Sequence, residues 1–294
     1  MQTIPCKTLL TTNKNSNWFG TEFNMNIYRG CSHGCIYCDS RSECYGNEGF
    51  QTVRAKENAI GILAEQLLHK KKKGVVGTGA MSDPYNPMEK TYRLTAQALE
   101  LFARFSFGTA IATKSPLITR DTVLLQEIQR HAPVICKITI TTADDKLCRQ
   151  IEPSVAPTTE RLEAIHTLSN GGIFTGILLM PILPFITDTT ENIKSILTQA
   201  KAAGAKFAYP AFGVTLRDRQ REYYYQQLEQ LFPGLKEQYI QTYGNSYVCS
   251  TLQAKQLYPF FQEQCRALGL LYRMKDIIQA YKDTNMPKQL SFFP

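Results

Sequence analysis

Hydrophobic and polar positions alternate along the first two thirds of the chain in a pattern that predicts a repeated strand–helix unit. Residues 57–70 carry Ile60, Leu63 and Leu67 at helical spacing, and residues 74–79 form a short apolar run directly after them. Such alternation is typical of parallel α/β folds, in which each helix covers the sheet that the strands build.

Six such units are predicted. We expect strands at residues 23–28, 74–79, 108–113, 134–141, 173–180 and 206–212, and helices at residues 57–70, 92–105, 119–131, 158–170 and 189–203. Six units are too few to close a ring of eight, so the sequence predicts a partial (β/α)6 TIM-type barrel that is open on one side.

The pattern changes after residue 215. Residues 217–232, 235–243, 252–268 and 275–281 read as helices without intervening strands. We therefore expect a barrel core with its N-terminal segment over residues 1–215. A C-terminal helical extension over residues 216–294 is expected to pack on that barrel and to end in a short tail motif.

Composition narrows the class of protein. The chain has 294 residues, 43% of them hydrophobic, which suffices for a barrel-sized core. Its nine cysteines are odd in number and irregularly spaced, which argues against a disulfide scaffold. We find no resemblance to a signal peptide and no apolar stretch that could cross a bilayer, so we expect a cytoplasmic protein without membrane contact. The net charge of +8 agrees with a polyanionic partner, although residues 70–73, all lysine, supply part of it.

Three cysteines gather just after the first predicted strand, at Cys31, Cys35 and Cys38. Three thiolates in one tight loop repel one another unless a positive group binds among them, so the spacing predicts a metal or a metal cluster. Zinc needs a fourth protein ligand, for which His33 and Cys44 are the nearby candidates. An iron–sulfur cluster held by three thiolates leaves one iron open to a substrate or cofactor. Both occupants remain open on the residues alone.

The spacing Cys-x3-Cys-x2-Cys, with Tyr37 directly before the last cysteine, resembles the signature of the radical S-adenosylmethionine (SAM) enzymes. This resemblance implies a [4Fe-4S] cluster on the three cysteines and SAM bound at its open iron. It also implies a one-electron donor such as flavodoxin or ferredoxin. Reductive cleavage of SAM would then give a 5′-deoxyadenosyl radical that abstracts hydrogen from a substrate.

Polar and apolar side chains at the ends of the other predicted strands suit such a cofactor. Ser82 and Asp83 could accept hydrogen bonds from an ammonium group, and Lys114 could pair with a carboxylate. Thr139 could reach a ribose, and Met180 lies on an apolar edge that suits an adenine ring. Each has an ordinary alternative: a turn for the Ser-Asp pair, β-branched strand composition for the threonine, and core packing for the methionine.

Several separated motifs together resemble the spore photoproduct lyase-like branch of these enzymes, over about residues 20–213. The motifs are Ser82-Asp83-Pro84-Tyr85, Thr113-Lys114-Ser115-Pro116, Glu152-Pro153 with Arg161-Leu162, and Met180-Pro181-Ile182-Leu183-Pro184. The resemblance implies that Ser82 and Asp83 contact the amino group of SAM, that Lys114 contacts its carboxylate, and that Thr139 lies near its ribose. Tyr37 and Met180 complete the expected cofactor contacts.

One position departs from that branch. The lyase that repairs thymine dimers has a cysteine directly before the Ser-Asp pair, which returns a hydrogen atom to the product radical, whereas this chain has Met81. A thioether has no S–H hydrogen to give, so dimer repair by that route is not expected. Cys44 and Tyr85 are the candidate hydrogen donors, with Cys6 and Tyr45 as further substitutes.

The C-terminal tail offers a second indication of function. The pentapeptide Gln-Leu-Ser-Phe-Phe, from Gln289 to Phe293, resembles the short peptide by which bacterial DNA-processing proteins bind the DNA polymerase sliding clamp. The alternative is that these apolar residues fold back onto the barrel. We expect a radical SAM enzyme that acts on a nucleic-acid-related substrate, in DNA repair or modification. The alternatives are radical modification of a peptide or small metabolite, and a non-catalytic zinc-stabilised nucleic-acid-binding protein.

Overall fold

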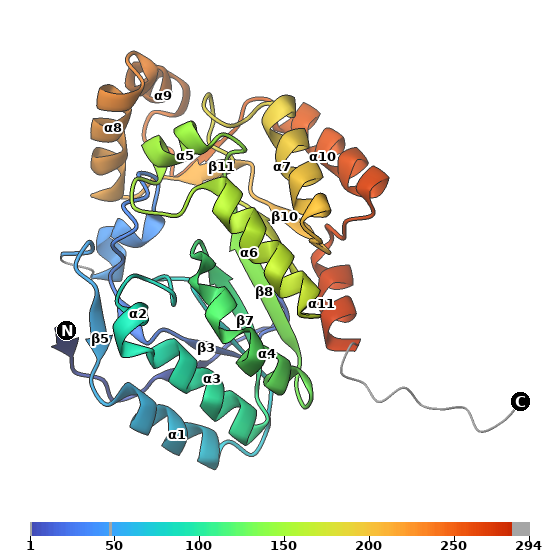
Figure 1. The fold of residues 1–294 in the computed structure, drawn as a ribbon. Coiled ribbons are helices and arrows are strands. Elements are labelled where there is room, and N and C mark those ends of the chain that lie inside the picture. The colour runs from blue at the N-terminus through green and yellow to red at the C-terminus, as the bar shows by residue number, and fades with distance from the viewer. Residues whose placement is uncertain (1, 47–48, 284–294) are drawn as a thin grey trace, which may run out of the picture.

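A curved seven-stranded sheet forms the centre of the computed structural model, which describes residues 2–46 and 49–283 (Figure 1). Its strands lie in the spatial order β10 (Ala208–Pro210), β9 (Thr175–Leu179), β8 (Val134–Thr139), β7 (Gly108–Thr113), β6 (Val75–Thr78), β3 (Phe23–Met25) and β2 (Leu10–Thr12). Neighbours from β10 to β3 are parallel, whereas β2 pairs antiparallel with β3. The predicted six parallel strands of a partial α/β barrel are thus confirmed, with β2 as an additional edge strand.

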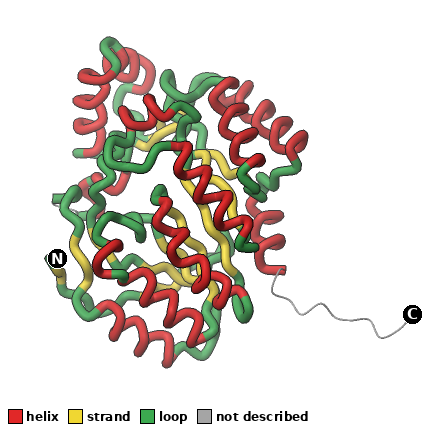
Figure 2. The backbone as a smooth tube through the Cα atoms, in the orientation of Figure 1, coloured by secondary structure: helices red, strands yellow, loops and turns green. Residues whose placement is uncertain are grey.

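Helices cover the outer face of this sheet (Figure 2). They are α1 (Ala59–His69), α3 (Leu94–Phe105), α4 (Thr122–Gln129), α6 (Thr158–Asn170) and α7 (Thr190–Ala202). Helix α3 is typical, since it buries Ala98, Leu99 and Phe102 on one face. Each large apolar side chain removed from water contributes about 1.5–3 kcal/mol, which is why the helical spacing of apolar residues predicted these elements.

Short elements interrupt the predicted units. Helices α2 (Glu89–Tyr92) and α5 (Asp145–Ile151) are additional to the predicted ones, and the 3-10 helix η3 (Pro116–Asp121) replaces the start of the helix predicted at residues 119–131. They span only one or two turns, which is too short for a periodic apolar pattern to reveal them.

The predicted first strand is divided in two. Its second part, β4 (Tyr28–Arg29), leaves the barrel and joins β5 (Arg54–Lys56) and β1 (Thr3–Ile4) in a separate three-stranded sheet. The cysteine loop therefore follows β4 and continues into the short 3-10 helices η1 (Asp39–Arg41) and η2 (Glu43–Tyr45). A continuous apolar run does not reveal where a strand changes its pairing partner.

The C-terminal region consists of α8 (Gln220–Leu231), α9 (Leu235–Tyr243), α10 (Ala254–Leu268) and α11 (Met274–Asp283). Helices α8 and α9 pack on each other near the cysteine loop, and α10 packs on α7 (Figure 1). The expectation of helices without intervening strands was wrong, because β12 (Val248–Ser250) pairs antiparallel with β11 (Gly213–Thr215). Three-residue strands are too short to show an alternating pattern.

Apolar side chains close the barrel at the amino ends of its strands and form what we call the barrel floor. The floor comprises Phe19, Ile135, Phe207, Ile277 and Tyr281. The hydroxyl of Tyr281 donates to the carbonyl of Phe19 over 2.6 Å. The N-terminal loop and the last described helix thus complete the barrel together.

Two sequence expectations concern the membrane and the tail. In the described part of the chain, no helix has the length and apolarity needed to cross a membrane. The clamp motif from Gln289 to Phe293 lies outside the described residues.

Candidate active site

Backbone hydrogen bonds hold the cysteine loop to the segment before β5 and to the end of α5. Cys31 donates its amide to the carbonyl of Phe50 over 2.7 Å, and Ile36 donates to Ile151 over 3.0 Å. The preceding Gly30 has a φ of +80°, and a Cβ there would lie 2.4 Å from the carbonyl oxygen of Thr52. Glycine is therefore required where the loop begins.

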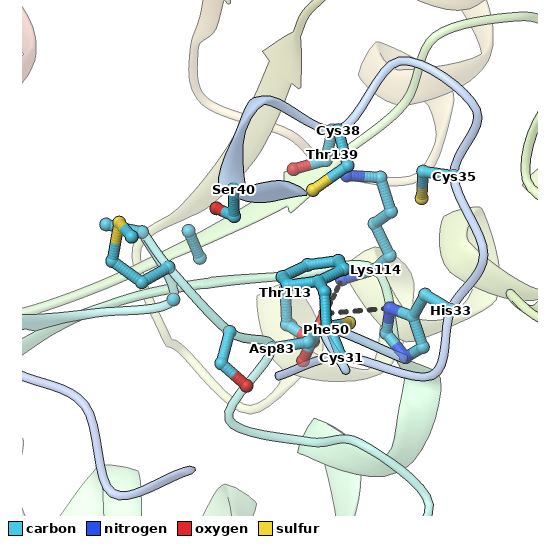
Figure 3. A pocket seen from close by; sticks show the side chains of 15 residues that line it. Cys31, His33, Cys35, Cys38, Ser40, Phe50, Asp83, Thr113, Lys114 and Thr139 are labelled. Carbon is cyan, nitrogen blue, oxygen red and sulfur yellow. Dashed lines mark hydrogen bonds and ion pairs between the residues drawn. The ribbon is translucent and has the colours of Figure 1, made fainter. Parts of the chain in front are cut away.

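The three thiols line one cavity of about 120 Å³ (Figure 3). Cys31 and Cys35 are buried and Cys38 is half-buried, and the side chain of Lys114 extends among them (Figure 3). The loop thus brings together the three cysteines that the sequence singles out.

The chemistry of this donor set fits an iron–sulfur cluster. Burial raises the pKa of the Cys31 thiol to about 11 and that of the Cys35 thiol well above its ordinary value. Both thiols are therefore protonated at neutral pH unless a positively charged group binds among them. Within residues 2–46 and 49–283, no three His, Cys, Asp or Glu side chains are grouped to hold a single metal ion. Three thiols spread around a cavity are the ligands that a cubane cluster with one open iron requires.

Asp83 connects the cavity wall to the cysteine loop. Its carboxylate accepts hydrogen bonds from the hydroxyl of Thr113 at 2.6 Å and from the backbone amide of Lys114 at 2.8 Å. The same carboxylate lies 3.5 Å from Nδ1 of His33, whose pKa is lowered by burial although Asp83 opposes this effect. Asp83 and the neighbouring Ser82 both line the cavity, and the hydroxyl of Ser82 donates to the carbonyl of Gly30 over 2.5 Å.

A buried ion pair lies behind the cysteine loop. The side chains of Glu152 and Arg161 contact each other while both are at most 1% exposed. Burial alone would raise the pKa of Glu152, but Arg161 and Lys114 more than offset it and hold that pKa below its usual value. The Tyr37 hydroxyl donates to Glu152 and lies 3.2 Å from Thr141 Oγ1. This network fixes the cysteine loop at Tyr37.

Lys114 carries its positive charge into the centre of the site. Burial alone would lower its pKa, yet Cys35 and Glu152 raise it above the ordinary value. Its ammonium lies 5.7 Å from the centre of the Tyr37 ring. An ammonium that keeps its charge at such a position can pair with a carboxylate, so the predicted role of Lys114 stays a prediction.

A second cavity of about 490 Å³ adjoins the first. The two share Cys38, Gly79, Lys114 and Thr139 among their lining residues. The larger cavity also contains Met180 and Tyr37, and it reaches from Asn24 on β3 to the β11 residues Gly213, Val214 and Thr215. It therefore spans the open side of the barrel, between the first and the last parallel strands.

The two candidate hydrogen donors lie elsewhere. Of the residues that the structure describes, those lining the two cavities do not include Cys44 or Tyr85. Cys44 is exposed beside Arg217, with 3.1 Å between its sulfur and Nη1. Tyr85 is 1% exposed beneath Arg120, which lies 5.9 Å from the centre of its ring. By contrast, Met81 does line the smaller cavity.

Sequence reasoning missed three residues of the site. The sequence suggests His33 only as a zinc ligand and Thr113 only as part of a motif, whereas in the structure both contact Asp83. Lys137 lines the larger cavity and was not singled out. A lysine within the apolar run of residues 134–141 was the available signal, because charged residues are rarely found inside a buried parallel strand.

Comparisons with known proteins identify relatives of this chain. The model of the family described as "Radical SAM superfamily" matches residues 25–197. An uncharacterized protein of Methanocaldococcus jannaschii is 30% identical over 218 residues, which are 73% of this chain and 78% of that protein. An uncharacterized protein of Mycobacterium tuberculosis is 29% identical over 247 residues, covering 82% of this chain and 72% of the relative.

Two more distant matches are a named enzyme and a solved structure. The radical SAM Nα-GlyT isomerase of Pseudomonas phage M6 is 22% identical over 175 residues, covering 59% of this chain and 35% of that protein. Spore photoproduct lyase in complex with a dinucleoside spore photoproduct superposes with a TM-score of 0.68 at 14% identity, covering 92% of this chain and 81% of the lyase. The chain therefore belongs to the radical SAM superfamily, has the fold of spore photoproduct lyase, and is an enzyme that uses a [4Fe-4S] cluster and SAM.

Proposed function

We propose that this enzyme carries out its radical reaction in the larger cavity, on a nucleic-acid-related substrate. The observation that carries the proposal is the pair of adjoining cavities. The smaller cavity gathers the three thiols, and the larger one, mostly apolar, spans the open side of the barrel. Apolar walls exclude water, which protects a reactive radical from side reactions.

The side chains of the smaller cavity would hold the cofactors. Cys31, Cys35 and Cys38 as thiolates would bind the cluster, and Lys114 would neutralise the carboxylate of SAM. When bound, the cluster and SAM supply the 5′-deoxyadenosyl radical that removes a hydrogen atom from the substrate. Asp83, fixed by Thr113 and by the amide of Lys114, keeps its carboxylate facing the loop.

Other side chains would orient the nucleoside part of SAM. Thr139 lines both cavities, so its hydroxyl is available to a ribose that extends from one into the other. Ser82 would help Asp83 receive the amino group of SAM. Met180 and Tyr37 line the larger cavity and offer apolar surface to the adenine ring.

Three observations favour a nucleic-acid-related substrate. The fold is that of a lyase whose structure contains a dinucleoside photoproduct, and the relative from phage M6 is named as a Nα-GlyT isomerase. The net charge of +8 favours contact with phosphate groups. We do not extend dimer reversal to this chain, because Met81 offers no S–H hydrogen to a product radical.

Partners and location follow from the same chemistry. The cluster requires a one-electron donor, for which a flavodoxin or ferredoxin is suited. All nine cysteines are free thiols, which suits a reducing compartment such as the cytoplasm. We further propose that the tail from Gln289 to Phe293 binds the DNA polymerase sliding clamp, which a pull-down with and without these residues would test.

The test is anaerobic reconstitution of the cluster followed by addition of dithionite and SAM. We expect 5′-deoxyadenosine to form faster with DNA oligonucleotides than with a mixture of tryptic peptides or with no substrate. Stimulation by peptides and not by DNA would instead favour modification of a peptide. A Cys35→Ser variant, which lacks one cluster ligand, is the negative control.

A further inference from the structure

Lys137 occupies an unusual position in the centre of the barrel. It lies on β8 two residues before Thr139, is only 2% exposed, and lines the larger cavity. Its amino group lies 4.5 Å from the centre of the Phe19 ring, a member of the barrel floor. Within residues 2–46 and 49–283, no hydrogen bond or ion pair accompanies this aromatic contact. The amine also interacts electrostatically with the thiol of Cys136, but burial raises the pKa of that thiol to about 12, so it is neutral and supplies no counter-charge.

The fold alone gives no reason for a lysine at this position. A buried ammonium without a counter-charge destabilises a protein, whereas an apolar side chain of similar length fills the same space without that penalty. The neighbouring floor residues are all apolar or aromatic. Burial lowers the pKa of Lys137 to about 7, so the amine carries only part of its charge at neutral pH. The buried position of this lysine is therefore explained by a ligand that enters the cavity.

The charges around the cavity indicate what that ligand is. Lys114 and Lys137 both face the larger cavity, and so does Asp39. The carboxylate of Asp39 is engaged by the hydroxyl of Tyr45 at 3.1 Å and by Nε of Arg217 at 3.5 Å. Lys114 lies beside the cysteines, where the carboxylate of SAM is proposed to bind. The amine of Lys137 is thus available to bind a second anionic group.

We propose that Lys137 binds an anionic oxygen group, a carboxylate or a phosphate, of the substrate at the bottom of the larger cavity. The inference rests on the proposal that the radical reaction takes place in this cavity. Asn24 lines the same cavity, and its side-chain amide nitrogen donates one hydrogen to Asn13 and has a second one to offer. Lys137 and Thr139 are two residues apart on β8, which corresponds to about 7 Å along the strand. An anionic group bound by Lys137 would therefore fix the distance between the substrate and the cofactors near Thr139.

The chain provides its own probe for a test. Trp18 is the single tryptophan and lines the same cavity, so its fluorescence reports ligands that enter there. The experiment titrates the reconstituted, SAM-bound holoprotein with sodium acetate and with inorganic phosphate at constant ionic strength, using chloride as the reference salt. We expect a saturable change with at least one of the two anions, and the preferred anion identifies the group as carboxylate or phosphate.

Two variants make the test specific. In Lys137→Met, we expect the dissociation constant of the preferred anion to rise at least tenfold, while iron content and SAM affinity stay within twofold of the wild type. Lys194→Met, at an exposed position of α7, should leave all three quantities unchanged. The proposal is overturned if neither anion changes Trp18 fluorescence, if Lys137→Met binds the anion as well as the wild type, or if that variant weakens SAM binding tenfold, which would assign the amine to the cofactor.

The same experiment separates this inference from the proposed function. If the wild-type protein fails to bind the cluster or SAM, the proposed use of the cavities is wrong. If cluster and SAM bind normally and the anions act independently of Lys137, only the assignment of Lys137 is wrong.

Discussion

Replacing Lys137 with methionine should stabilise the protein, by an amount that depends on pH. Methionine has a similar length and is apolar, so it would occupy the space between Phe19 and the cavity without a charge to bury. The prediction is unusual because most substitutions of fully buried residues destabilise. It follows directly from the lack of a counter-charge for this amine among the described residues.

The magnitude follows from the pKa. Burial lowers the pKa of Lys137 from 10.5 to about 7, so between these pH values the unfolded chain binds one proton more than the native chain. Stability therefore rises with pH in this range, by about 1.4 kcal/mol per pH unit where the difference is complete. The burial of Lys137 thus lowers the free energy of unfolding by about 5 kcal/mol at about pH 6.5 and by about 2 kcal/mol at about pH 9.

Lys137→Met removes this destabilisation. The difference in free energy of unfolding between the variant and the wild type should therefore shrink by more than half between those two pH values. At the lower pH, the apparent melting temperature should rise on the order of 10 °C. Of the other groups that face the cavity, Lys114 and Tyr37 have raised pKa values and keep their charge state over this range.

The assay is urea denaturation of anaerobic holoprotein at matched iron content, followed by far-UV circular dichroism at several pH values. Lys194→Met serves as the control and should differ little from the wild type at any pH. A Lys137→Met protein that is less stable than the wild type, with a difference that does not change with pH, would refute the reasoning. The lysine would then be needed for the fold itself.

Three further predictions concern the site. Cys35→Ser should lose most of the bound iron and the brown colour of the reconstituted protein, measured by iron analysis and visible absorbance. Lys114→Ala should weaken SAM binding about tenfold or more in equilibrium dialysis while the iron content stays unchanged, and equal affinity would contradict its role. Glu152→Gln should lower the free energy of unfolding by about 3 kcal/mol in urea, because it leaves the buried Arg161 without its counter-charge, whereas unchanged stability would show that this pair does not hold the loop.

The sequence predicted the parallel strands well because they depend on local patterns, and the same kind of pattern singled out three cysteines that line one cavity in the structure. Each barrel strand is a short apolar run followed by a helix of regular spacing, and the three cysteines lie within eight residues. Strands β11 and β12 were missed because each has only three residues, and their pairing joins segments that lie far apart in the chain. Such contacts leave no periodic trace in the sequence.

The surroundings of individual site residues could not be predicted in this way. Asp83 and Thr113 are 30 residues apart, and the hydrogen bond between them exists only because β6 and β7 are neighbours in the sheet. The burial of Lys137 depends on Phe19, which reaches the barrel floor from the N-terminal loop. In both cases the chemistry of a side chain is set by tertiary neighbours, whereas local sequence specifies only its residue type.

The barrel floor has a consequence for how the protein is made. Tyr281 and Phe19 are separated by 262 residues, yet their hydrogen bond joins the two sides of the floor. During synthesis the early strands leave the ribosome long before α11 exists, so the barrel interior stays open to water until Met274–Asp283 has emerged. Contacts of such long range slow folding, because the chain must close a large loop before they form. The closed floor of the barrel is therefore a late product of folding, and a chain that ends before α11 would leave the cavity open at its base as well.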